Sequence, residues 1–305
     1  MAAPRVLVVG DLMLDVVVAP ARRLEMGTDV PGRVLLRQGG SAANTARWLA
    51  RLGARSTLVC AIGRDAEGRS LVAALESDGV RLRALRVTGE RTGRIGVIVA
   101  PGGERSFVAD RGAADRLAPA DLRPAQFQVD LLHLPAYSLL GEPLGKAGRR
   151  AVELARQSGA LVSLDLSSVG PLLADGRRSA QALVREMAPD ILFATRTEAD
   201  ALLGRSGPDR VATLAPVVVL KHGRSGASVI ATGDRDPVSF VVATAPLDAS
   251  DSTGAGDAFD AGFLVSWLSA PAEARCRPAA LRRAAVAGNR AAARQLASPA
   301  RALTL

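Results

Sequence analysis

The chain has 305 residues, 48% of them hydrophobic, and a formal net charge of +9. This length and apolar content favour a well-packed globular protein with one large α/β domain or two smaller ones. The positive charge does not indicate a nucleic-acid partner. Only Lys146 and Lys221 are lysines, the arginines are scattered along the chain, and the aromatic residues, at 3%, offer few platforms for stacking bases.

The cysteines and histidines form no recognisable metal site. Cys60 and Cys276 are isolated, which indicates free thiols in a reducing compartment. His133 and His222 are too few and too far apart for a histidine site. No apolar run approaches the ~18 residues that span a bilayer, and the N-terminus lacks the pattern of a signal peptide. We therefore expect a cytoplasmic protein with no membrane partner.

In the first third of the chain, short apolar runs alternate with helical patterns. We expect strands at 5–10 and 56–62, helices at 42–52 and 67–78, and an extended continuation at 12–19. This alternation predicts a parallel sheet covered on both faces. Two further strands, 93–100 and 105–110, flank the turn Pro101-Gly102-Gly103. Such a hairpin breaks the alternation and indicates an appended sheet.

The alternation resumes in the rest of the chain. We expect strands at 131–134, 160–166, 191–194 and 217–220, separated by helices at 144–157, 178–187 and 198–203. A late hairpin at 227–231 and 239–242 precedes two helices, 255–268 and 279–296. No internal repeat or interdomain linker is apparent.

The segment from Asp251 to Phe259 (DSTGAGDAF) carries the strongest chemical signal. Its two glycines allow the backbone to approach a ligand closely, and the helix that follows presents unpaired N–H groups to an anion. Asp257 then lies beside this anion site. A carboxylate base next to a phosphate cradle indicates phosphoryl transfer.

Three other features are polar sites at the ends of predicted strands. The first, from Gln38 to Asn44, is a glycine pair opening a helix, either a ligand site or an ordinary helix start with Ser41 as N-cap. Asp15 follows the first strand and is a turn residue or a polyol-binding carboxylate. The segment from Lys221 to Gly226 is a nucleotide-binding loop or a plain hairpin turn. The fingerprints of P-loop, dinucleotide-binding and α/β-hydrolase proteins are absent from the sequence.

In order and spacing, these motifs resemble those of the ribokinase-like sugar kinases, the PfkB family, over essentially the whole chain. The resemblance implies an α/β, three-layer sandwich with a mainly parallel central sheet. It also implies a single domain, 1–305, whose small β-sheet lid comes from about 13–38 and 93–111 and closes over the sugar. Family members are often dimers joined through their lids.

The resemblance also assigns roles to residues. It makes Asp257 the catalytic base, which takes the proton from the attacking sugar hydroxyl. The remaining matches are the anion hole at Gly254, Ala255 and Gly256, the sugar contacts Asp15, Gly39, Gly40 and Asn44, and the ATP-site residues Lys221, Gly223, Gly226 and Asn289.

The cofactors implied are ATP and Mg²⁺, and K⁺ in members with a monovalent cation site. Asp251 lies where those members place a cation ligand. Glu198 matches a residue that positions Mg²⁺ through water, whereas Thr195 replaces the family's asparagine in the same ATP-site motif. Two further departures are the missing carboxylate after His133-Leu134-Pro135, which weakens ribose as substrate, and the segment 297–300, which lacks the usual Gly-Ala.

We therefore expect an ATP-dependent kinase that phosphorylates a hydroxyl, in our interpretation a primary one, of a monosaccharide or sugar acid. Arg105 or Arg111 would pair with a carboxylate or phosphate of the substrate, or else remain solvated charges of the hairpin. The alternatives are a nucleoside kinase, with Phe107 or Tyr137 stacking on the base, and a catalytically silent sugar- or nucleotide-binding module.

Overall fold

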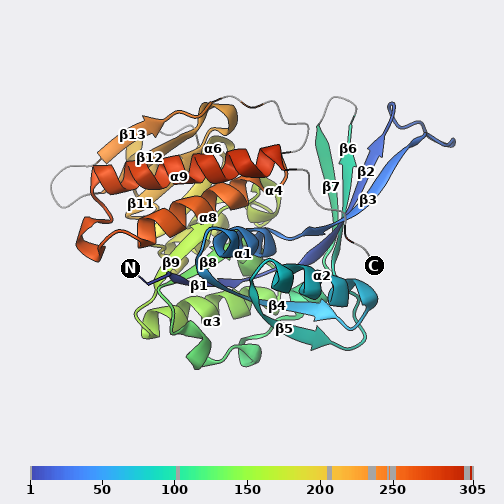
Figure 1. Cartoon of the computed structure of the whole chain (residues 1–305), viewed down its shortest axis with the longest axis horizontal. Coiled ribbons are helices and arrows are strands. Elements are labelled where there is room, and N and C mark those ends of the chain that lie inside the picture. The colour runs from blue at the N-terminus through green and yellow to red at the C-terminus, as the bar shows by residue number, and fades with distance from the viewer. Residues whose placement is uncertain are drawn as a thin grey trace.

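A nine-stranded sheet runs through the centre of the protein (Figure 1). The computed structural model describes residues 2–100, 104–204, 208–232, 238–245, 247, 252–298 and 303. Within these ranges the strand order is β13-β12-β11-β10-β9-β8-β1-β4-β5, parallel from β11 to β5 and antiparallel at β12 and β13. The strands are β1 (Arg5–Val9), β4 (Arg55–Gly63), β5 (Arg81–Val87), β8 (Leu131–Pro135), β9 (Leu161–Asp165), β10 (Ile191–Thr195), β11 (Val217–Lys221), β12 (Ala227–Ala231) and β13 (Val238–Val242).

Helices cover both faces of this sheet. One apolar core joins the sheet to α1, α2, α8 and α9, and a second joins the other face to α3, α5 and α6. This arrangement confirms the predicted three-layer α/β sandwich. The described helices are α1 (Ser41–Arg51), α2 (Ala66–Ser77), α3 (Leu144–Gln157), α4 (Val169–Leu172), α5 (Arg177–Met187), α6 (Arg196–Leu203), α7 (Pro208–Val211), α8 (Ala255–Leu268) and α9 (Pro278–Ala297). In the described ranges, no helix combines the length and apolar content needed to cross a membrane.

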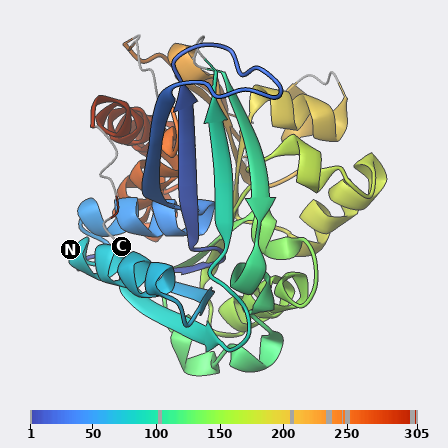
Figure 2. The same ribbon diagram turned by 90° about the vertical axis from the view of Figure 1, so that its right-hand side faces the viewer.

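A second sheet of four strands stands at one end of the molecule (Figure 2). The strand order of this sheet is β3-β2-β6-β7. The central pair, β2 and β6, is parallel, whereas the pairs β3–β2 and β6–β7 are antiparallel. The strands are β2 (Met13–Pro20), β3 (Gly32–Gly39), β6 (Arg94–Val99) and β7 (Arg105–Asp110). The extended segment expected at 12–19 is thus confirmed as β2, which leaves the central sheet and joins the second one.

Two strands lie where the sequence patterns predict none. Strand β5 (RLRALRV) alternates arginine with apolar residues, and it forms the outer edge of the large sheet, where one side needs no partner. Strand β3 (GRVLLRQG) is largely exposed over its first half. Both are edge strands, so neither carries the continuous apolar run of a buried parallel strand.

Asp65 anchors the start of α2 to the segment that enters the second sheet. Its carboxylate is the N-cap, accepting a hydrogen bond from Gly68 N (2.8 Å), and it also accepts from Thr92 N (2.7 Å) and Thr92 Oγ1 (2.6 Å). Burial acts to raise the pKa of Asp65, but these hydrogen bonds outweigh it and hold the pKa below its ordinary value.

Asp65→Ala should lower the free energy of unfolding at pH 7 by roughly 2–4 kcal/mol, because three donors lose a charged acceptor. The pKa of Asp65 is lowered on folding, so its contribution is complete above the unfolded pKa and is lost as the pH falls through the folded value. Urea unfolding should thus show a smaller difference from the parent at pH 3 than at pH 7. The exposed Asp175→Ala serves as control, and an equal loss in both variants would contradict the anchoring role.

Candidate active site

Helix α8 begins where the predicted anion site lies. Its N-cap is Gly254, in the left-handed conformation with φ 74°, and its bounds match the predicted 255–268. The first N–H groups of a helix lack partners within the helix, and the helix dipole adds partial positive charge there. The start of α8 therefore suits an anion.

Asp257, in the first turn of α8, is held by side chains of α1. Ser41 Oγ donates to one carboxylate oxygen at 2.7 Å, and Asn44 Nδ2 donates to the other at 3.0 Å. Gln38 Nε2 in turn donates to Asn44 Oδ1 at 3.1 Å, which turns the amide nitrogen of Asn44 towards Asp257. Two residues more than 200 positions upstream thus fix the orientation of this carboxylate.

The surroundings of Asp257 favour its neutral form more than water does. Burial raises the pKa of Asp257 to about 7, and the nearby Asp165 carboxylate adds to this increase. The hydrogen bonds from Ser41 and Asn44 and the ammonium of Lys221 act in the opposite direction. A carboxyl group with this pKa is partly ionised at neutral pH, as a general base requires.

The glycine pair before α1 permits close packing around this site. Gly40, with φ 93°, is the N-cap of α1, and a Cβ there would come within 2.7 Å of Asp11 O. A Cβ at Gly39 would clash with the Asp15 carboxylate. The reading of Ser41 as an N-cap is therefore wrong, because Ser41 is already helical and its hydroxyl serves Asp257.

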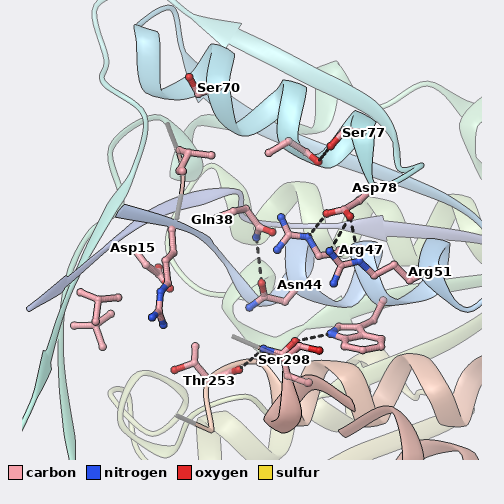
Figure 3. A pocket seen from close by; sticks show the side chains of 18 of the residues that line it. Asp15, Gln38, Asn44, Arg47, Arg51, Ser70, Ser77, Asp78, Thr253 and Ser298 are labelled. Atoms are coloured by element: carbon pink, nitrogen blue, oxygen red, sulfur yellow. Dashed lines mark hydrogen bonds and ion pairs between the residues drawn. The ribbon is translucent and has the colours of Figure 1, made fainter. Parts of the chain in front are cut away.

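A cavity of about 900 Å³ opens between the second sheet and the body (Figure 3). Asp15 and Gln38 reach it from β2 and β3, Asn44 from α1, and Thr253 and Gly254 from the turn before α8. Its remaining polar and charged lining residues are Arg37, Arg47, Arg51, Ser70, Ser77, Asp78, Arg105, Gln295 and Ser298.

The two arginines predicted to meet the substrate lie in different places. Arg105, on β7, lines this cavity and donates to Thr253 Oγ1 (2.8 Å) and Ser252 Oγ (3.3 Å). Arg111 instead faces Asp11, at 3.5 Å, and its Nε donates to Asp115. The structure thus brings Arg105 to the start of α8, whereas Arg111 is held by two carboxylates.

A second cavity, of about 630 Å³, lies on the other side of the same turn. Four residues predicted for the ATP site line it, namely Lys221, Gly223, Gly226 and Asn289. Ser252, Ala255 and Gly256 also line it, and Phe259, Leu247 and Leu296 give it an apolar part. Asn289 Nδ2 donates to the carbonyls of Val242 and Ala243, both at 3.3 Å, which ties α9 to the end of β13.

The residues predicted to act on Mg²⁺ and K⁺ do not line either cavity within the described part of the chain. Thr195 and Glu198 form a capping box at the start of α6, in which Glu198 accepts from Thr195 N at 2.7 Å. Burial and the nearby Asp165 raise the pKa of Glu198. Asp251 lies outside the described residues, as does part of the segment 297–300. Among the described residues, no cluster of three or more His, Cys, Asp or Glu side chains could hold a metal.

Several residues at the site carry no local sequence signal. Gln295, on α9, accepts from Trp48 Nε1 and donates to Thr253 O, both at 2.9 Å, so it joins α1 to the turn before α8. Asp165 and Asp260 surround the Lys221 ammonium. Ser41 belongs to a predicted motif, where it was either a polar group of a ligand site or an N-cap. Asp165, Asp260 and Gln295 reach the site through the order of the strands and the packing of α8 and α9.

The raised pKa of Asp257 implies a pH-dependent cost to stability. Because the pKa is raised on folding, the contribution of this group is present below the unfolded pKa and is lost as the pH rises through about 7. Asp257→Asn should therefore gain roughly 1–3 kcal/mol of unfolding free energy relative to the parent between pH 5 and pH 8.5. Urea unfolding at both pH values measures this, with Asp175→Asn as control. A difference independent of pH would contradict the raised pKa.

Comparison with known proteins identifies the family. The family described as "pfkB family carbohydrate kinase" matches residues 3–300. Probable fructokinase-4 of Arabidopsis thaliana is 30% identical over 269 residues, covering 84% of this chain and 79% of that protein. The ATP-dependent ribose-1-phosphate kinase of Halopiger xanaduensis is 31% identical over 280 residues, covering 87% and 85%. The structure of adenosine kinase from Sinorhizobium meliloti superposes with a TM-score of 0.83 at 24% identity, covering 97% and 95%. The chain belongs to the pfkB family of carbohydrate kinases.

Proposed function

We propose that this sugar kinase transfers the γ-phosphoryl group of ATP to a hydroxyl of a monosaccharide or sugar acid, with Asp257 as the base. One observation carries the proposal. Thr253 and Gly254 line the first cavity, and the adjacent Ser252, Ala255 and Gly256 line the second. An acceptor in the first and a nucleotide in the second would therefore meet at the start of α8.

Asp257 is suited to taking the proton of the acceptor hydroxyl. Ser41 and Asn44 hold its two oxygens, and its pKa of about 7 leaves it partly ionised at neutral pH. As the hydroxyl oxygen bonds to the γ-phosphorus, its proton passes to Asp257 and the bond from that phosphorus to the β-phosphate oxygen breaks. The N–H groups of Gly254, Ala255 and Gly256 would stabilise the charge on the transferred group.

The second cavity has the features of a nucleotide site. The backbone at Gly223 and the start of α8 offer N–H groups for phosphates, and Phe259, Leu247 and Leu296 offer an apolar surface for the base. Gly226 lines the same cavity, and its N–H donates to Gly223 O at 3.1 Å, which closes the turn. Mg²⁺ would offset charge on the phosphates of the bound nucleotide. Among the described residues, no cluster of carboxylates could bind this ion directly. The Glu198 carboxylate already accepts a hydrogen bond from Thr195 N, so it would act on the ion through a bridging water. The assays below are run with and without K⁺, because Asp251, the predicted ligand of this ion, lies outside the described residues.

The second sheet would act as the lid. Arg105 of β7 already reaches Thr253 and Ser252, so closure of this sheet would bring further polar groups over the acceptor and exclude water. The same sheet exposes Val34, Phe107 and Val108 by 61–66%. We propose that two copies of the chain pair through this surface.

The charge of the first cavity favours an anionic acceptor. Among its described lining residues, Arg37, Arg47, Arg51 and Arg105 outnumber the carboxylates Asp15 and Asp78. Asp78 is shared, at 2.7 Å, by Arg47 and Arg51. Guanidinium groups recognise carboxylate and phosphate groups well. This supports a sugar acid or a phosphorylated sugar over an uncharged one.

Asp257→Asn should lower kcat by roughly 10³-fold or more with little change in KM for ATP, because it removes a proton acceptor used only in the transition state. ADP release with Mg²⁺, with and without K⁺, measures this. Asp110→Asn, an exposed residue at the end of β7, is the control. Undiminished turnover by folded Asp257→Asn would refute the base assignment.

Among fructose, ribose, gluconate, ribose 1-phosphate and adenosine, we expect the anionic acceptors to give the highest kcat/KM. Their advantage should fall at high salt and in Arg37→Gln, because it depends on charge. If fructose or ribose has the highest kcat/KM, the proposed preference for anionic acceptors is wrong, but the proposal of a sugar kinase stands. If adenosine is fastest, the chain is a nucleoside kinase. ATP binding with no ADP release for any acceptor would indicate a silent binding module.

A further inference from the structure

The ammonium group of Lys221 is buried directly beneath the start of α8. Lys221 ends β11, and its Nζ lies 3.0 Å from Asp165 Oδ1 and 3.2 Å from both carboxylate oxygens of Asp260. The side chains of the three residues are 11%, 5% and 0% exposed. A Cβ placed on Gly256 would be 3.4 Å from the same Nζ. The cation therefore touches the predicted anion hole from inside the protein.

Two carboxylates hold this ammonium from inside the protein. Asp165 Oδ1 accepts one hydrogen bond, and the two oxygens of Asp260, both at 3.2 Å, share a second N–H. Two of the three N–H donors of Lys221 are therefore engaged by these carboxylates. The side chain also lines the second cavity.

The cluster joins three elements that carry the site. Asp165 ends β9, Lys221 ends β11, and Asp260 lies one helical turn after Asp257 on α8. Because β10 separates β9 from β11, the Lys221 side chain crosses over β10, with Nζ 6.0 Å from the ring centroid of Phe193. Fixing Asp260 therefore fixes the rotation of α8, and with it the direction of Asp257.

The same cluster sets the charge around Asp257. The groups that face it are the neutral Ser41 and Asn44 of α1, Tyr137 after β8, Asp165 of β9, Lys221 of β11 and, on its own helix, Asp260. Lys221 is the cation among these groups and favours ionised Asp257, whereas Asp165 opposes it. Burial acts to lower the pKa of Lys221, but Asp165, Asp260 and Glu198 outweigh it, so Lys221 stays charged.

We propose that Lys221 is a positioning residue for phosphoryl transfer, whose ammonium, held by Asp165 and Asp260, fixes the rotation of α8 and with it the direction of Asp257. This inference rests on the proposal that Asp257 is the base. It assigns Asp165 and Asp260 to the site as well, and it makes the positioning of α8 the main role of the Lys221 side chain.

Two substitutions should shift the pH dependence of catalysis in opposite directions. Lys221→Met removes the cation that favours ionised Asp257, so the rise of kcat with pH should move to higher pH by roughly half a unit or more. Asp165→Asn removes a like charge, so the same rise should move to lower pH. In Asp165→Asn, Lys221 keeps Asp260, so this variant tests the proposal even if Lys221→Met folds poorly.

The experiment measures kcat and KM for ATP from pH 5 to 9, with the fastest acceptor of the panel above. Lys221→Met should lose roughly 100-fold in kcat through misplacement of α8, with KM for ATP within about threefold of the parent. Lys221→Arg, which keeps the charge, should return the pH profile towards the parent. Lys146→Met removes the other lysine, which is 69% exposed on α3, and should change nothing.

A readout without an acceptor runs in parallel. The pH at which the difference in unfolding free energy between Asp257→Asn and its parent stops changing reports the titration of Asp257 in the folded protein, and it should move up in the Lys221→Met background and down in the Asp165→Asn background. Unmoved profiles with a tenfold or greater rise in KM for ATP in Lys221→Met would make Lys221 a nucleotide ligand and overturn the proposal. If instead Asp257→Asn keeps full activity, the base assignment fails, and only the unfolding data then judge the cluster.

Discussion

The start of α8, where the first N–H groups lack partners within the helix, is the constraint around which this structure is arranged. A helix N-terminus attracts anions only if the backbone before it leaves room for them, and Gly254 and Gly256 provide that room. The two cavities meet there because one turn, 252–256, forms a wall of each. The parallel strands end at the same edge, so α1 and the ends of β9 and β11 bring their polar side chains to that wall.

Burial of charge at this edge costs free energy, and the charged groups differ in the partners that offset this cost. Lys221 is matched by two carboxylates, which leaves Asp257 with hydrogen bonds from neutral groups only. Burial raises the pKa of Asp257 to about 7, and it also raises the pKa values of Asp260 and Glu198. The electrostatic cost of this site is therefore spread over several buried carboxyl groups.

Local patterns predicted the elements that make the site and missed the contacts between them. The bounds of α3 and α8 follow from helical spacing of apolar residues and from the glycines beside them. Strand β5 was missed because arginines alternate through it, as suits an edge. The family resemblance supplied Asp257 and Asn44, yet Asp165, Asp260 and Gln295 have no assigned role in it. The order of the strands and the packing of α8 bring Asp165 and Asp260 to Lys221, and the packing of α9 brings Gln295 to Thr253. Long-range charge pairing is not encoded in a short window of sequence.

The hold of α1 on Asp257 has a consequence for which hydroxyl of a sugar reacts. A carboxylate offers about four lone-pair positions, and Ser41 and Asn44 already occupy one on each oxygen. An incoming hydroxyl must therefore use the directions that remain. Since the hydroxyls of a sugar are chemically similar, the proposed role of Asp257 as the base makes regioselectivity a matter of approach angle, set by a helix more than 200 residues before Asp257 in the chain.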